Sequence, residues 1–227
     1  IVFCWGLEYV FVKQAMENIE ALTIVFLKYS IGTLIILAVQ LKKDGRRFLP
    51  QKRDILLFIA CAVFGEIAYY YCEYNAMNYL PVSLITIILS FIPVASMATE
   101  RILFKTRVTR PMLLGSLICV AGVCMIIGAD IKELLSGRLI GYLLAFGAVI
   151  SWNFYNFITA SLHGRYSSIA LTLNQEIFSV LLIFPYAIHH MPKPEALTPG
   201  TIGGLLYLGI VSAAIGYLVF VKALHVI

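Results

Sequence analysis

Two glutamates lie inside an apolar, aromatic segment that is long enough to cross a membrane. Glu66 and Glu73 are seven residues apart within residues 56–77. A charged side chain at the centre of a bilayer costs about 2.5 to 3.5 kcal/mol on insertion scales, so such residues usually face the interior of a helix bundle and have a function there. These two carboxyl groups therefore constrain both the fold and the function of the chain.

The rest of the chain is similarly apolar. Of its 227 residues, 61% are hydrophobic and 13% are charged, which lies outside the range of soluble domains. Seven runs have about the 20 residues needed to cross a ~30 Å hydrocarbon core: 21–41, 55–77, 81–103, 111–129, 139–161, 168–189 and 201–223. With a shorter apolar segment at residues 1–13, they predict eight helices of an all-α, multi-pass integral membrane protein.

The first apolar segment is not expected to be a signal peptide. No basic region precedes it and no small-residue cleavage site follows it. We expect instead that the chain begins inside its first helix, which is therefore partial.

Basic residues are unevenly distributed among the expected loops. One set of alternate loops holds 11 Lys and Arg residues and the opposite set holds four. Because cytoplasmic loops carry the excess of Lys and Arg, the first set is predicted to be cytoplasmic. The net charge of +5 thus reflects membrane topology in a bacterial-type plasma membrane, and the expected partner is the lipid bilayer, not nucleic acid. The first set comprises Lys42, Lys43, Arg46, Arg47, Lys52, Arg53, Arg101, Lys105, Arg107, Arg110 and Arg165, and the second Lys13, Lys132, Arg138 and Lys193.

No metal ion or cofactor is expected. His189 and His190 are adjacent in sequence, which does not place them on one helix face. The five cysteines form no CxxC pair and are typical of small packing residues inside helices. They are Cys4, Cys61, Cys72, Cys119 and Cys124.

The second half of the chain aligns with the first at an offset of 147 residues. This offset matches the expected helices 1–13, 21–41 and 55–77 with 139–161, 168–189 and 201–223 without a gap. It pairs seven identical residues, among them Trp5 with Trp152 and Tyr70 with Tyr217. Apolar composition alone nearly supplies so few identities, so the inference depends on the shared helix boundaries.

A repeat unit of five helices makes the second copy enter the membrane from the opposite side. We therefore expect an inverted five-plus-five helix repeat, an architecture of secondary transporters with the substrate site near the midplane between the halves. The first copy is expected at residues 1–130 and the second at residues 131–227. The chain then holds eight of ten helices, the first partial and the last two missing.

Residues 74–128 carry a series of features that belong together in one transporter group. They are Asn75-Ala76-Met77-Asn78-Tyr79, a turn with Pro81 and Ser83, then Pro93, Glu100, Gly115 and Gly122-Val123. Trp5-Gly6, Phe11-Val12-Lys13 and Lys222-Ala223-Leu224 add to the pattern near the two ends. With these features the chain resembles the EamA-type families of the drug/metabolite transporter superfamily.

The resemblance implies a ten-helix carrier of two inverted EamA domains with both termini in the cytoplasm. Such carriers move small metabolites or amino acids, often outward. No family motif covers Glu8, Glu66 or Glu73, so the resemblance gives these residues no role.

The two glutamates of segment 55–77 are expected at different depths. The helix runs outward from Asp54, and a rise of about 1.5 Å per residue places Glu66 about 18 Å deep, near the midplane. Glu73 is about 28 Å along, where its carboxylate either reaches outer water or has a function. Glu66, Tyr70 and Glu73 share one helix face by their spacing.

Glu66 is the main candidate for proton coupling. Burial favours the protonated form of a carboxyl group. Glu66 is therefore either a protonated packing residue or a group that is protonated in one access state and ionised in the other. Glu8, expected deep in the partial first helix, is the second candidate.

Aromatic and amide side chains are expected to line the substrate site beside these acids. Segment 168–189 adds Asn174, Gln175 and Glu176. Such a lining suits a compact polar solute with an apolar or cationic part. The candidates for substrate binding are Trp5, Glu8, Glu66, Tyr70, Ser90, Trp152, Tyr155, Asn156, Asn174 and Tyr217.

Several polar residues have two readings. The hydroxyls of Thr86 and Ser90 either bind substrate or bond to their own helix, which Pro93 is expected to kink. Lys28 either extends to the outer surface or pairs with a carboxylate.

A stripe of small residues marks one side of segment 111–129. Gly115, Cys119 and Gly122 are typical of close helix packing, either within the chain or in a homodimer.

These features favour a secondary transporter, expected to export small metabolites or amino acids, and no enzyme activity is expected. A membrane enzyme needs clustered His, Asp, Ser or Cys near an interface, and a seven-helix receptor would not show a doubled five-helix unit. Within the superfamily, the alternative is a nucleotide-sugar or sugar-phosphate exchanger. Its anionic substrates require a cationic site, whereas the deep charges here are mostly acidic, with Lys28 as the exception.

Overall fold

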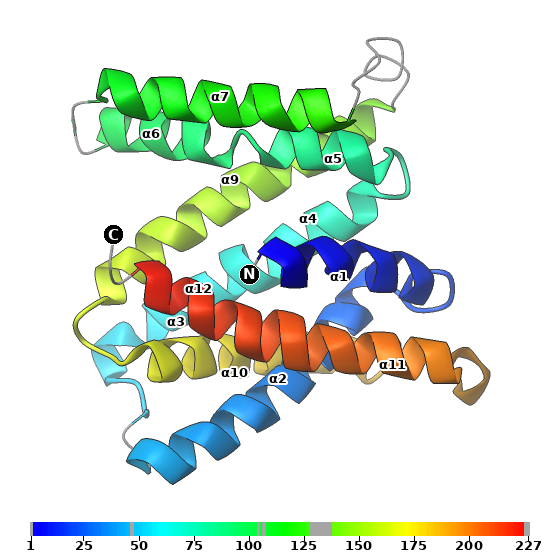
Figure 1. Cartoon of the computed structure of the whole chain (residues 1–227). Helices are drawn as coiled ribbons and strands as arrows, with labels where there is room; N and C mark the ends of the chain where they lie inside the picture. Colours follow the sequence, from blue (N-terminus) through cyan, green and yellow to red (C-terminus); the bar gives the residue numbers. More distant parts are fainter. Residues whose placement is uncertain (1, 46–47, 104, 106–107, 128–137, 225–227) are drawn as a thin grey trace. The chain divides into compact units, whose positions relative to one another are not determined.

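The regular structure of the chain is helical in the computed structural model, which describes residues 2–45, 48–103, 105, 108–127 and 138–224 (Figure 1). The α-helices are α1 (Val2–Ala15), α2 (Ala21–Asp44), α3 (Ile55–Cys61), α4 (Tyr69–Ala76), α5 (Val82–Leu89), α6 (Ile92–Leu103), α7 (Arg110–Ile127), α9 (Leu139–Leu162), α10 (Ser168–Ala187), α11 (Pro199–Tyr207) and α12 (Tyr217–Leu224). Short 3-10 turns are η1 (Lys52–Asp54) and η3 (Pro194–Ala196), and η2 (Ala62–Ala68) and η4 (Leu208–Gly216) are π-helical. The predicted all-α class is confirmed.

Six spans in the described part of the chain are long and apolar enough to cross a membrane. They are Ala21–Lys43, Lys52–Ala76, Val82–Ile102, Leu139–Leu162, Ser168–Ala187 and Pro199–Ala223, and each coincides with a predicted segment. The predicted segment 111–129 corresponds to a shorter apolar helix, Arg110–Met125, and its last two residues lie outside the described ranges. Segment 1–13 corresponds to α1. The prediction of a multi-pass membrane protein is confirmed.

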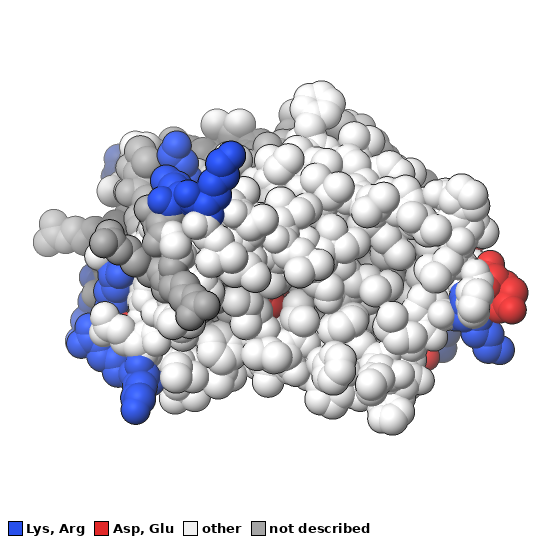
Figure 2. All heavy atoms as spheres, turned by 90° about the horizontal axis from the view of Figure 1, so that it is seen from below, with Lys and Arg blue, Asp and Glu red and all other residues white. Residues whose placement is uncertain are grey.

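The surface has the character expected of helices embedded in lipid. Large apolar side chains are exposed on the described helices; Leu34 of α2 is 68% exposed and Leu56 of α3 is 74% exposed. Figure 2 shows Lys and Arg side chains gathered at one end of the face that it presents, with acidic and basic side chains at the other end. The wide band between them is almost free of charge, as a hydrocarbon environment requires.

The helices form two compact units whose boundaries fall inside α4 and α9. Unit 1 comprises Ile1–Tyr70 and Tyr155–Ile227, and unit 2 comprises Tyr71–Phe154. Unit 1 thus contains segments from both predicted sequence copies. The division into copies at residues 1–130 and 131–227 stays a prediction.

In unit 2, the span after Pro81 is interrupted at Ser90 and Phe91, between α5 and α6. Pro93, the second residue of α6, has no amide hydrogen to continue the helical ladder. Ser90 donates a hydrogen bond of 2.6 Å to the Ile87 carbonyl, and Thr86 donates one of 2.8 Å to the Val82 carbonyl. Both hydroxyls therefore bond to their own helix, and the kink expected at Pro93 takes the form of a break.

Unit 2 has an apolar core between α5 and α9 and a polar link between α6 and α9. The buried core residues are Ala76, Leu80, Leu84, Ile85, Ile88, Ala145 and Val149. Asn153 of α9 accepts a 2.9 Å hydrogen bond from Ser96 and donates one of 2.6 Å to Thr99.

On α7, a methyl group added at Gly115 or Gly122 would meet no described atom within 4 Å, so packing of this stripe in a homodimer stays a prediction.

In unit 1, α2 packs on α10 and on both π-helical segments, and α10 also packs on η2. A small apolar core of Ile36, Leu173 and Ala214 joins α2, α10 and η4. The two π-helical segments lie at equivalent positions of the predicted repeat, because the offset of 147 moves residues 62–68 onto 209–215. Short π-helical stretches inside α-helices occur frequently at functional sites.

A buried aspartate joins two loops at one end of unit 1. Asp54, 1% exposed at the start of α3, lies 2.5 Å from Nη1 of Arg165 and accepts a 2.8 Å hydrogen bond from the Tyr166 hydroxyl. The amide of Gln51 donates to the same hydroxyl at 2.9 Å. Burial raises the pKa of Tyr166 above its usual value of 10.0, so this hydroxyl keeps its proton and remains a donor.

We expect Asp54→Asn to destabilise the fold, because it removes the charge that Arg165 and Tyr166 both contact. Hydrogen bonds to charged groups contribute about 1.5–3 kcal/mol, and the loss should fall near the lower figure because Arg165, 40% exposed, can be hydrated instead. The thermal unfolding midpoint in detergent measures the effect. Arg53→Gln is the control, since Arg53 is 70% exposed and lies 4.0 Å from Asp54. Equal midpoints for the two variants would contradict the role of this contact.

Candidate functional site

Four charged side chains are buried together inside unit 1. Glu8 of α1 is 5% exposed, and Lys28 of α2, Glu66 of η2 and Glu176 of α10 are 0% exposed. Each comes from a segment that is otherwise apolar, so the helices place the charges away from water. Burying an unpaired charge is costly, and the partners of each group therefore determine its state.

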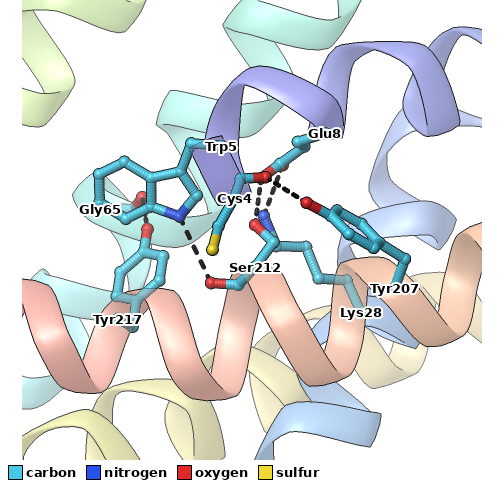
Figure 3. Close-up of polar contacts among 8 residues, drawn as sticks. All are labelled: Cys4, Trp5, Glu8, Lys28, Gly65, Tyr207, Ser212 and Tyr217. Atoms are coloured by element: carbon cyan, nitrogen blue, oxygen red, sulfur yellow. Dashed lines mark hydrogen bonds and ion pairs between the residues drawn. The ribbon is translucent and has the colours of Figure 1, made fainter. Parts of the chain in front are cut away.

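Glu8 and Lys28 form an ion pair (Figure 3). Nζ of Lys28 lies 2.6 Å from Oε1 of Glu8, and Ser212 of η4 donates a hydrogen bond to Oε2 of the same carboxylate. Both carboxylate oxygens are thus occupied. Of the two readings for Lys28, the structure shows pairing with a carboxylate and not extension to the surface.

The ammonium group of Lys28 also lies over aromatic rings. Its Nζ is 3.7 Å from the ring centroid of Tyr70 and 5.4 Å from that of Tyr29. A cation over a ring face gains about 2 kcal/mol when it is desolvated. Glu8, Tyr70 and Tyr29 together hold this ammonium group at a fixed place.

Aromatic side chains surround the charged cluster. Tyr217 is the centre of the group: its ring centroid lies 5.8 Å from Trp5, 5.9 Å from Tyr29 and 6.3 Å from Tyr155. Its hydroxyl donates a 3.4 Å hydrogen bond to the carbonyl of Gly65, the residue before Glu66 (Figure 3). The indole nitrogen of Trp5 donates to the carbonyl of Ser212 at 3.4 Å. The structure therefore brings together Trp5, Glu8, Glu66, Tyr70, Tyr155 and Tyr217 of the predicted site.

Glu66 differs from Glu8 in its surroundings. Neither of its carboxyl oxygens has a hydrogen-bond partner among the described residues, although both are buried. It lies in electrostatic range of Glu176 and Lys28 and beside Ser179. A carboxyl group in such a place is poorly stabilised as an anion, so it is suited to carry a proton.

Glu176 completes the cluster; the sequence places it beside the expected site, although it is not among the predicted substrate-binding or proton-coupling residues. Thr33 donates a 3.4 Å hydrogen bond to its Oε2, and its Oε1 has no partner in the described part of the chain. The signal that marks Glu66, a carboxyl group in the middle of an apolar span, also applies to Glu176.

Two sets of contacts in unit 1 are related by the offset of 147. The offset moves Glu8 onto Tyr155, Lys28 onto Gln175, and Gly65 onto Ser212. Tyr155 donates a 3.3 Å hydrogen bond to Oε1 of Gln175, which is the neutral counterpart of the ion pair. Gly65 lies so close to the Tyr155 ring that an added Cβ atom would overlap it. At the equivalent place, Ser212 contacts Glu8. The same geometry thus holds an ion pair in one place and a neutral pair in the other.

The remaining predicted site residues lie elsewhere or have local partners. Asn174 donates a 2.6 Å hydrogen bond to the carbonyl of Phe48, which links α10 to the segment after α2, and one of 2.7 Å to the carbonyl of Ala170 within α10. Asn156 has a buried Oδ1 atom without a partner among the described residues. Ser90 and Trp152 belong to unit 2, where Trp152 is 7% exposed. A role of these residues in substrate binding stays a prediction.

Comparisons with known proteins agree with the membrane architecture. A model of the EamA-like transporter family matches residues 1–128 and 139–227. An "Uncharacterized transporter" of Archaeoglobus fulgidus is 22% identical over 217 residues, which cover 94% of this chain and 74% of that protein. The "Uncharacterized inner membrane transporter YhbE" of Escherichia coli is 25% identical over 190 residues, 81% of this chain and 59% of that protein.

Two further comparisons cover almost the whole chain. The "Uncharacterized transporter YvbV" of Bacillus subtilis is 25% identical over 221 residues, which make up 97% of this chain and 71% of that protein. A solved crystal structure matches 99% of this chain and 76% of its own, with a TM-score of 0.74 and 16% identity, which supports the fold alone. The chain therefore spans about three fifths to three quarters of the length of these proteins.

We expect Lys28→Met to destabilise the protein strongly, because it leaves the Glu8 carboxylate buried without its cation. Breaking a buried ion pair by removing one partner costs about 3–5 kcal/mol. The double variant Glu8→Gln/Lys28→Met, which leaves no buried charge at this place, should lose less. Thermal unfolding in detergent compares them, with Lys13→Met at an exposed position as the control. Equal losses in the single and double variants would show that the pair is not coupled.

A second prediction concerns the glycine beneath Tyr155. Gly65→Ala should lower the stability by about 1–3 kcal/mol, because the added methyl group must displace a buried ring. Gly203→Ala is the matched control: its added methyl group would meet no described atom within 4 Å, so the change should be neutral or slightly stabilising in a helix. Unfolding midpoints of the two variants in the same detergent check this. If both variants melt like the wild type, Tyr155 does not pack on Gly65.

Proposed function

The chain belongs to the EamA-like transporter family, and on this premise we propose that it is a secondary active transporter that exports small metabolites or amino acids. It is a multi-pass protein of the bacterial-type plasma membrane, in line with its six apolar spans and its inner membrane relative. Membrane transport is the function that the family and the names of its relatives have in common. The substrate class, the outward direction and the coupling to protons are the proposed part.

Glu66 is the observation that carries the proton coupling. Its carboxyl group is 0% exposed, lies inside the π-helical segment η2 and has no hydrogen-bond partner among the described residues. A structural role would call for a partner, since an unpaired ionised group in hydrocarbon costs several kcal/mol. A group that takes up a proton in one access state and releases it in the other requires such a setting.

Glu8 is the weaker of the two coupling candidates. Lys28 and Ser212 occupy both of its carboxylate oxygens, so the anion is well stabilised where it lies. Protonation of Glu8 would leave the Lys28 ammonium without its counter-ion. We therefore assign the coupling to Glu66 and a positioning role to Glu8.

The inverted five-plus-five repeat, with copies at residues 1–130 and 131–227, is part of this proposal. Three observations support it: the family model matches two stretches of the chain, the π-helical segments occur at equivalent positions, and the Glu8 and Tyr155 contacts are related by the same offset. In transporters built this way the substrate binds near the midplane, between the repeats. The tyrosines and Trp5 around Glu66 suit a compact solute with an apolar or cationic part.

A sugar-phosphate or nucleotide-sugar exchanger is the less favoured alternative. Its substrate needs buried cations in excess. Among the described residues of the buried cluster in unit 1, three carboxyl groups accompany a single ammonium group, and Glu8 already neutralises that ammonium. This composition favours a neutral or cationic solute.

Transport assays with the full-length protein in liposomes test the proposal. A pH-sensitive dye in the lumen should report proton movement when standard amino acids are added singly, and Glu66→Gln should abolish the dependence of transport on the pH gradient. Glu17→Gln removes an exposed carboxyl group and is expected to behave like the wild type. Transport by Glu66→Gln at the wild-type rate and with unchanged pH dependence would refute coupling through this residue.

A further inference from the structure

The buried cluster of unit 1 contains a second carboxyl group in nearly the same situation as Glu66. Glu66 and Glu176 are both 0% exposed, and three of their four carboxyl oxygens have no hydrogen-bond partner among the described residues. The fourth, Oε2 of Glu176, accepts only a 3.4 Å hydrogen bond from Thr33. The segments that carry them, η2 and α10, pack against each other, so two carboxyl groups without a strong partner lie in one buried region.

Other elements around this region bring groups that titrate or donate hydrogen bonds. Those with an electrostatic or hydrogen-bonding relation to Glu66 or Glu176 are Lys28, Tyr29 and Thr33 of α2, Cys61 of α3, Tyr155 of α9, Ser179 of α10 and Tyr217 of α12. Glu8 of α1 contacts the cluster through Lys28 and Ser212. Lys28 is the cation of this set, and it is held by Glu8 at 2.6 Å.

The charges in this region limit how many carboxylates can be ionised together. The Glu8–Lys28 pair is neutral as a whole, so each ionised carboxyl group beyond it adds an uncompensated negative charge. Two carboxylates that share one site cannot both ionise easily, because each raises the free energy of the other's charged form. Lys28 favours a single negative charge near it, because it lies in range of both carboxyl groups.

The occupant that this region accepts most readily is a proton. Both carboxyl groups are fully buried, so an organic cation or a metal ion would have to displace packed side chains. A proton needs no additional space. The Ser179 hydroxyl lies beside Glu66 and can donate to a carboxylate or accept from a protonated carboxyl group, so it suits either state.

We propose that Glu66 and Glu176 act as one coupled proton site, in which release of a proton from one carboxyl group makes the other hold its proton more firmly. The proposal deepens the proposed function, because it makes Glu176 the second member of the coupling site. It also gives the site a defined stoichiometry, since the pair exchanges one proton readily and retains the other. The two carboxyl groups come from η2 and α10, so movement of one segment past the other would change the coupling.

Infrared spectroscopy tests the pair directly and needs no substrate. The purified protein is titrated in lipid nanodiscs while the carbonyl stretch of protonated carboxyl groups is followed. Exposed carboxyl groups ionise near pH ~4, so the band at neutral and alkaline pH reports buried groups. We expect the wild type to lose this band in two steps separated by about one pH unit or more.

The glutamine variants distinguish a coupled pair from two independent groups. Glu66→Gln and Glu176→Gln should each show a single step at a pH below that of the upper wild-type step, because the remaining carboxyl group then lies beside a neutral amide, and the double variant should show neither step. Glu17→Gln removes an exposed carboxyl group of the same unit and should leave both steps in place. If either single variant keeps a step at the pH of the upper wild-type step, or if the wild type shows no step, the proposal is overturned.

Two additional measurements separate loss of a carboxyl group from loss of the fold. Circular dichroism and gel filtration identify a variant that does not fold, and Glu66→Asp and Glu176→Asp, which keep both carboxyl groups, should retain two steps. Wild-type protein that titrates in two coupled steps but transports none of the amino acids would contradict the proposed substrates and leave this inference standing. Transport that depends on Glu66 but not on Glu176, together with independent titration steps, would overturn the coupled proton site and leave the proposed function standing.

Discussion

The ion pair between Lys28 and Glu8 determines how charge is distributed inside unit 1. A membrane interior tolerates a charged group when its partner is close, and here an ammonium group, a carboxylate, a serine hydroxyl and an aromatic ring meet at one point. Because this cation is committed to Glu8, it cannot fully compensate Glu66 or Glu176. Those two carboxyl groups are thereby left as the part of the interior whose charge can change.

The local backbone contributes to the same arrangement. Glu66 lies in the π-helical segment η2, and Ser212, which contacts Glu8, lies in the π-helical segment η4. A π-helical turn shifts the following side chains around the helix axis, so it presents groups that a regular α-helix would place on another face. Both segments pack against the pair α2 and α10, which carries Lys28 and Glu176. The irregular backbone segments are therefore the ones that carry or contact the buried charged groups.

The sequence allowed the helices and part of the site to be predicted, and the limits have physical causes. Hydropathy locates membrane spans because the bilayer sets their length, and it marks Glu66 because a charge in such a span is exceptional. The partner of Lys28 was left open, since the choice between water and Glu8 depends on where the packing of α1 on α11 and η4 places the Glu8 side chain. The π-helical segments lie inside apolar spans and do not change the hydropathy pattern, so that pattern does not predict them. Ser90 and Asn174 satisfy nearby carbonyl groups, which residue type alone does not reveal.

The position of the Glu8–Lys28 pair also bears on how the interior of unit 1 is assembled. α1, which carries Glu8, packs on α11 and η4, and Ser212 of η4 donates a hydrogen bond to the second oxygen of Glu8. The fixed charge pair is therefore completed only when these later segments reach α1. Glu66 likewise meets Glu176 only after α10 has been made. Charges carried by the early helices are thus held in place by segments that are synthesised late.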